Sequence, residues 1–185
     1  MRNLTVIIIA FCFVFFLGCY KKTDCPGFPA NLNYFPYTLG QYLDFVNSLQ
    51  DTSTFIIFEK VKTVDYTVYF SRPGFKPPCN TTMHFHMASN KEKKEISGGF
   101  LIDGGGPGII NFAEIVILFE KDIFKKVIIE DVKISYNEIE NYLTDTLSIE
   151  NMVNKTVKKV VIVKGEGIVS YTTADGEEWK LLDVN

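Results

Sequence analysis

The sequence predicts a mainly β protein, an antiparallel meander that forms a sandwich or a curved, partly closed barrel with at most one or two short helices. Apolar and polar residues alternate in several short runs, which is the period of a half-buried strand. Turn-forming residues separate these runs at the spacing typical of sandwiches and barrels. No segment repeats at a fixed period, which argues against solenoids and propellers.

The first residues have the layout of a secretory signal peptide. Arg2 precedes an apolar run over 6–17, which is short for a bilayer span of roughly 20 residues. The bulky Phe16 does not suit the small-residue site at which ordinary signal peptides are cleaved. The segment Phe16-Leu17-Gly18-Cys19 resembles the lipobox of bacterial lipoproteins, and Gly18 and Cys19 match its last two positions. The resemblance implies cleavage between Gly18 and Cys19 and acylation of the Cys19 sulfur.

Acyl chains on Cys19 would anchor the mature protein in a membrane, since two or three chains give stable binding where one does not. Lipoproteins of this type lie in the bacterial cell envelope, and a residue other than Asp after the lipidated cysteine favours the outer membrane. Tyr20 occupies that position here. The alternatives are an uncleaved membrane anchor and a soluble secreted protein.

The predicted organisation is a signal peptide over 1–18, a lipidated tether over 19–37 and a single β-rich domain over 38–185. The tether prediction depends on three prolines and the absence of periodicity over 20–37. Cys12 leaves with the signal peptide, and Cys19 is committed to lipid. Cys25 and Cys79 then remain in an oxidising compartment, which predicts a disulfide between them, with two unpaired thiols as the alternative.

The domain begins with a predicted hairpin, in which strands over 42–48 and 53–61 flank a short polar turn. Leu39, Leu43, Val46 and Leu49 also fit helical spacing, so an α+β fold with a helix near 39–50 is the alternative. Further strands are expected over 63–71, 81–89, 94–103, 113–121 and 124–136, which with the C-terminal strands gives eight or nine. Residues 136–156 are polar and weakly patterned, consistent with a short helix or two.

The C-terminal region carries the clearest turn signals. Alternating residues on both sides of "ADGE", residues 174–177, predict an Asp-Gly hairpin in which Gly176 takes the positive φ of a type I′ turn. Gly165 and Gly167 lie two positions apart in "KGEGIVSY". That spacing within a predicted strand predicts a bulge or a close backbone approach.

His84 and His86, the two histidines of the chain, share one face of a predicted strand. Two imidazoles could begin a zinc or copper site, but such sites take three or four protein ligands. The pattern therefore favours a core strand with Met83, Phe85 and Met87 inward and the histidines facing solvent, and no metal is expected. The glycine-rich segment 103–108 lacks the Lys and Ser/Thr of a phosphate-binding loop.

Composition and motifs restrict the function classes. A net charge of −3 and a pI near 5.5 argue against nucleic-acid binding. No catalytic signature is present, and the acid pairs Glu138/Glu140 and Glu177/Glu178 are expected on solvated loops. We expect no cofactor and no enzyme, but an envelope lipoprotein with a partner-binding or structural role. The alternatives are a carrier for an apolar ligand or lipid in a β-sheet cavity, and an atypical hydrolase.

Overall fold

The computed structural model shows a mainly β protein. It describes residues 25, 33–66, 79–89, 91, 93–104, 109–120, 122–130, 132–136, 138–150 and 156–182, and at 64–66 it describes the backbone alone. The strands are β1 (Tyr42–Val46), β2 (Thr52–Tyr66), β3 (Cys79–Ser89), β4 (Lys94–Asp103), β5 (Ile109–Ile110), β6 (Phe112–Phe119), β7 (Asp122–Ile129), β8 (Ile134–Ser135), β9 (Thr146–Glu150), β10 (Val157–Val163), β11 (Gly167–Thr173) and β12 (Glu178–Leu181). One 3₁₀ turn, η1 (Ile139–Tyr142), is the only helix in these ranges.

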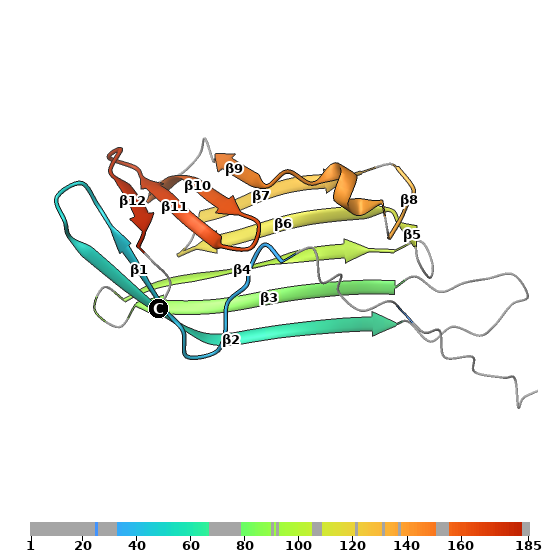
Figure 1. The fold of residues 1–185 in the computed structure, drawn as a ribbon, viewed down its shortest axis with the longest axis horizontal. Coiled ribbons are helices and arrows are strands. Elements are labelled where there is room, and N and C mark those ends of the chain that lie inside the picture. Colours follow the sequence, from blue (N-terminus) through green and yellow to red (C-terminus); the bar gives the residue numbers. More distant parts are fainter. Residues whose placement is uncertain are drawn as a thin grey trace, which may run out of the picture.

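Ten strands form a single antiparallel sheet in the order β7-β6-β4-β3-β2-β1-β12-β11-β10-β9. The sheet curls so that β9 and β7 approach each other, giving the nearly closed barrel seen in Figure 1. Strands β5 and β8 form a separate two-stranded ribbon. The predicted fold class is confirmed, and a barrel rather than a sandwich is found.

None of the helices in the described ranges has both the length and the apolar character needed to cross a bilayer.

The alternative helix near 39–50 is wrong, because this segment forms β1 and the turn that leads into β2. Leu43 and Phe45 point into the core at the two-residue period of a strand. The turn closes through Asn47, whose Oδ1 accepts hydrogen bonds from the amides of Leu49 (3.0 Å) and Asp51 (2.8 Å). Of the three leucines at helical spacing, only Leu43 is buried, and Leu39 and Leu49 are exposed, so they do not share one buried face.

Other differences from the expected strands have local causes. β2 is one continuous strand to Tyr66, and residues 67–71 of the next predicted strand lie outside the described part. The run 124–136 is divided between β7 and β8, and the polar region 136–156 contains η1 and the edge strand β9. At the "ADGE" hairpin only Gly176 has positive φ (94°), so the turn is not type I′, which needs two such residues.

Three aromatic residues ahead of β1 fill the interior of the barrel. Tyr34, Phe35 and Tyr37 are 0%, 0% and 1% exposed, and the Phe85 ring of β3 packs against both Phe35 (4.7 Å) and Tyr37 (4.9 Å between centroids). We call residues 33–38 the core segment. The predicted boundary between tether and domain at 37/38 therefore lies too late. Three prolines over 20–37 and a lack of periodicity concealed a segment that packs by its aromatic rings rather than by strand pairing.

A buried carboxylate closes the seam of the barrel. Asp122 begins β7, and its Oδ2 accepts hydrogen bonds from the amides of Thr156 (3.1 Å) and Val157 (3.0 Å) and from the Thr156 hydroxyl. β7 and β10 are not neighbours in the sheet. Asp122 thus joins the two ends of the meander by side chain where backbone pairing stops.

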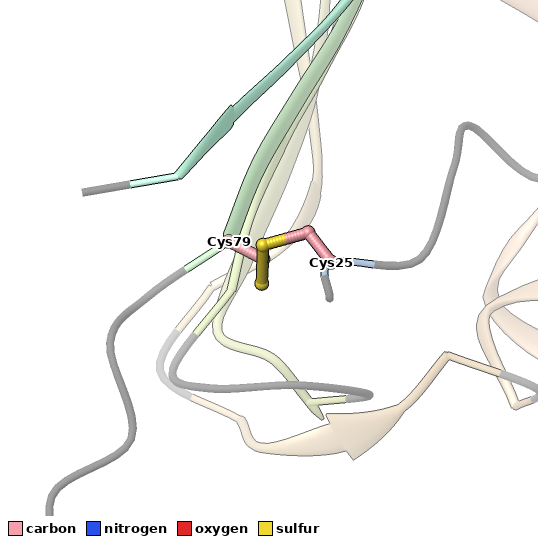
Figure 2. Close-up of a disulfide and its surroundings, with 2 residues drawn as sticks. All are labelled: Cys25 and Cys79. Carbon is pink, nitrogen blue, oxygen red and sulfur yellow. A yellow bond between two sulfur atoms is a disulfide. The ribbon is translucent and has the colours of Figure 1, made fainter. Parts of the chain in front are cut away.

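Cys25 and Cys79 are joined by a disulfide, with 5.5 Å between their Cα atoms (Figure 2). Cys79 is the first residue of β3 and is buried. The bond links residues 54 positions apart, so it attaches the N-terminal region to one end of the barrel. In the chain-entropy model, closing a loop of that length restricts the unfolded state by about 4 kcal/mol.

Candidate binding surface

The central strand β3 places both histidines on the outer face of the barrel. Its burial alternates strictly, and Met83, Phe85 and Met87 point inward. His84 is exposed and His86 half-buried on the opposite face. The orientation expected from the sequence is thus confirmed for these five residues.

A glycine of β4, Gly99, leaves a hollow beside these histidines. Gly99 pairs with His84, and a Cβ atom on Gly99 would lie 2.2 Å from the Met83 carbonyl oxygen. A Cβ atom on Gly98 would lie 2.5 Å from Ile117 Cδ1. Gly98 lies on the inner face, opposite Phe85, and only Gly99 lies on the outer face. The outer face therefore carries no side chain at position 99.

The resulting depression, the outer hollow, has a volume of about 450 Å³. Its lining comes from β2, β3, β4 and β6 and consists of Glu59, Thr82, Met83, His84, Phe85, His86, Ser97, Gly98, Gly99, Phe100, Leu101, Glu114, Val116 and Leu118. Leu101, Val116 and Leu118 supply an apolar strip on the outer face. A surface of this kind buries apolar area when it is covered, which is the main driving force for association.

Three carboxylates lie close to the apolar strip or its histidines. Glu59 Oε1 lies 3.5 Å from His84 Nε2, and Glu95 Oε2 lies 3.7 Å from His86 Nε2. Glu114 lies on the β6 side, and no Lys or Arg is among the lining residues. The hollow therefore offers an apolar strip with an acidic rim.

A bulge in β2 shapes the same region. The register shifts between Ile57 and Glu59, so Phe58 is pushed outward and its ring lies 4.3 Å from the His86 ring. After the bulge Lys60 is on the inner side, opposite Phe85, and its ammonium donates a hydrogen bond to the Tyr37 carbonyl. Burial lowers the pKa of Lys60, as does the positive charge of Lys62.

The buried ionisable groups of the interior have structural partners. The Tyr37 hydroxyl accepts a hydrogen bond from the Ile168 amide (2.6 Å), and burial raises the pKa of Tyr37. The Tyr34 hydroxyl donates to the Thr144 carbonyl (2.6 Å). Burial, with a further contribution from the Asp145 charge, raises the pKa of Tyr34 to about 12. Both phenols thus stay protonated at physiological pH and hold the core segment in place.

Most other residues that the sequence pointed to lie away from the outer hollow or outside the described residues. Gly18, Cys19 and the glycine run 105–108 lie outside the described residues. Glu138 and Glu140 are exposed, as expected. Glu177 differs from the expectation, because its carboxylate accepts hydrogen bonds from Asn47 Nδ2 (2.7 Å) and Trp179 Nε1 (3.0 Å) and so joins two hairpins.

Metal binding has little geometric basis on this surface. His84 and His86 are two imidazoles on one face, and the described residues contain no group of three or more His, Cys, Asp or Glu side chains that could hold a metal ion.

The residues that sequence reasoning missed are Glu59, Gly99 and Glu114. A glycine inside a strand pattern, here Gly99, was the available signal for a depression in the sheet.

Comparisons with protein-family models, with curated proteins and with solved structures each found no match.

Proposed function

We propose that this protein is a lipid-anchored protein of the bacterial envelope that binds a partner protein through the outer hollow and catalyses no reaction. The observation that supports this proposal is a contrast between the two faces of the sheet. The described interior is occupied by Tyr34, Phe35 and Tyr37, whereas the outer face carries an open, apolar depression. A barrel with a filled interior and a hollowed exterior is suited to contact a surface rather than to enclose a ligand.

The chemistry of the outer hollow indicates the kind of segment it would bind. The strip of Leu101, Val116 and Leu118 favours apolar side chains, and Glu59 and Glu114 favour a Lys or Arg beside them. The hollow lies over β3 and β4, in the interior of the sheet rather than at an edge strand. The partner would therefore be recognised by its side chains and not by adding a strand.

The membrane anchor is supported by the lipobox-like residues Phe16 to Cys19 alone. Acylation at Cys19 would place the protein in the envelope, and Tyr20 at the following position favours the outer membrane. If so, Cys19→Ser should move the protein from the membrane fraction to the soluble fraction. Membrane association that survives this substitution would contradict the anchor.

The carrier alternative has less support. The aromatic residues that could have lined a ligand cavity pack against one another, as in the Phe45–Tyr171 (5.3 Å) and Phe119–Tyr171 (4.8 Å) pairs. An apolar ligand could enter only if the core segment left the barrel. The two functions therefore require different positions of residues 33–38, which stay inside the barrel in a partner-binding protein and leave it in a carrier.

Site-specific crosslinking tests the binding surface. A photoreactive residue replaces Leu101 in the full-length protein, and intact envelopes are irradiated. We expect one discrete adduct that is at least several-fold weaker when Glu59→Lys or Glu114→Lys is added. Glu166→Lys, in the β10–β11 turn, changes the net charge equally and should leave the adduct unchanged.

A second position controls for nonspecific contact. The same photoreactive residue at Lys158, an exposed site on β10, should not give this adduct. Equal adducts from positions 101 and 158, or an adduct insensitive to both charge reversals, would overturn the proposed binding surface.

A further inference from the structure

The disulfide determines where the N-terminal tether meets the barrel. Cys79 begins β3, and its carbonyl accepts a hydrogen bond from the Gly104 amide (2.9 Å) just after β4. A Cβ atom on Gly104 would lie 2.9 Å from the Ile109 carbonyl oxygen of β5. The end of β4 and the β5–β8 ribbon therefore surround the attachment point, and we call this region the disulfide end (Figures 1 and 2).

Covalent distances limit how far the disulfide end can lie from a lipid on Cys19. Cys25 follows Cys19 by six positions, which span at most about 20 Å when fully extended. Without the disulfide, the first buried side chain after Cys19 among the described residues would be that of Tyr34, fifteen positions on, with a reach of about 50 Å. The disulfide thus more than halves the possible separation.

The disulfide end exposes large apolar side chains. Ile109 is 39% exposed on β5, and Val132 is 48% exposed just before β8. Tyr142, 48% exposed, lies on η1, which follows β8 and is tied to it by the hydrogen bond from the Glu138 amide to the Ser135 carbonyl (3.0 Å). Isoleucine, valine and tyrosine side chains are suited to the boundary between lipid headgroups and acyl chains.

We propose that the disulfide end is a membrane-contacting surface that rests on the lipid headgroup region, with Ile109, Val132 and Tyr142 in contact with the bilayer. This inference rests on the proposed acylation of Cys19. The short tether places this end of the barrel near the lipid surface, and its exposed apolar side chains then contact the headgroup region. The opposite end, with the β1–β2 turn, is then directed away from the membrane.

Tryptophan quenching by lipids tests this orientation. The full-length acylated protein is reconstituted into phosphatidylethanolamine–phosphatidylglycerol vesicles with brominated acyl chains, in a Trp179→Phe background. Val132→Trp reports on the disulfide end, and Leu49→Trp, at an exposed position (75%) in the β1–β2 turn, is the matched control. We expect quenching at position 132 to exceed that at position 49 several-fold. Ile109→Trp provides a second reporter if Val132→Trp does not fold.

Vesicle flotation separates the two ways in which the proposal can fail. If the protein with intact Cys19 floats with the vesicles and positions 132 and 49 are quenched equally, the orientation is wrong and the anchor stands. If the protein with intact Cys19 does not float, the anchor fails, and the orientation fails with it. The Cys19→Ser variant, which should not float, sets the baseline for both measurements.

Discussion

At the scale of single residues, the core segment is held in the barrel by the fit between Tyr37 and Gly167. A Cβ atom on Gly167 would lie 2.3 Å from the Tyr37 hydroxyl oxygen, so only glycine leaves room for the phenol. Gly167 also has a φ of 95°, which side chains disfavour. The sequence predicts a bulge or a close backbone approach at Gly165 and Gly167, whereas the structure shows a turn at 164–166 and a side-chain contact at Gly167. That contact was not predictable, because Tyr37 is 130 positions away.

Gly167→Ala should therefore destabilise the protein through both strain and collision, by about 2–4 kcal/mol. Gly165→Ala is the control, because Gly165 has a similar φ of 84° and nothing within 4 Å of an added Cβ atom. Urea unfolding should show a loss of only about 1–2 kcal/mol for this second variant. Equal losses for the two variants would contradict the packing of Tyr37 against residue 167.

The raised pKa of Tyr34 predicts a loss of stability at alkaline pH. Its folded-state pKa is raised to about 12, while an unfolded tyrosine titrates near 10. Between about pH 10 and pH 12 the unfolded state loses the proton that the folded state keeps, so the free energy of unfolding falls by up to about 1.4 kcal/mol per pH unit. Below pH 10 this contribution to stability is fully present.

Tyr34→Phe should remove this part of the alkaline slope in urea titrations. It should also cost about 1 kcal/mol at neutral pH, because the hydrogen bond to the Thr144 carbonyl is lost. A variant with the wild-type slope between pH 10 and pH 12 would show that Tyr34 is accessible to solvent in its ionised form.

At the scale of elements, the barrel seam depends on Asp122 rather than on a strand ladder. Asp122→Ala should lower the free energy of unfolding by about 2–4 kcal/mol, because the amides of Thr156 and Val157 lose a charged acceptor. Asp44→Ala is the control, since the half-buried Asp44 carboxylate accepts a hydrogen bond from the exposed Thr54 hydroxyl and its loss should cost less than about 1 kcal/mol. Similar losses from both substitutions in chemical denaturation would indicate that the seam is not a stabilising contact.

Elements with strong two-residue periodicity were predictable, and elements defined by distant contacts were not. The bounds of β4 agree with the expected 94–103, and β3 contains the whole of the expected 81–89. β9 was missed because an edge strand needs only one buried face, which here consists of Leu147 and Ile149. The two-residue strands β5 and β8 have no periodicity to detect.

The candidate site was predictable only in part for the same reason. The shared outer face of His84 and His86 follows from strand alternation, which is local. The outer hollow follows from Gly99 lying between His84 of β3 and Val116 of β6, and strand order is a property of the whole sheet. Glu59 reaches the same face only because of the bulge in β2, which leaves no clear mark in the sequence.

At the scale of the whole molecule, a barrel with a filled interior has its outer surfaces available for binding. The outer hollow offers one such surface over β3 and β4, and the disulfide end offers another at the attachment point of the tether. Both proposals require that residues 33–38 remain inside the barrel. A carrier would instead require that this segment exchange with solvent.

Hydrogen exchange at the Ile168 amide tests this requirement most directly, because that amide donates its hydrogen bond to the Tyr37 hydroxyl (2.6 Å). The full-length protein is measured by amide-resolved exchange, with Tyr171 of the same strand as the reference. We predict that Ile168 exchanges as slowly as Tyr171, and that Tyr37→Phe accelerates Ile168 alone. If Ile168 instead exchanges as fast as the exposed turn at 48–50 while Tyr171 stays protected, then the core segment leaves the barrel, and the account of a filled interior is contradicted.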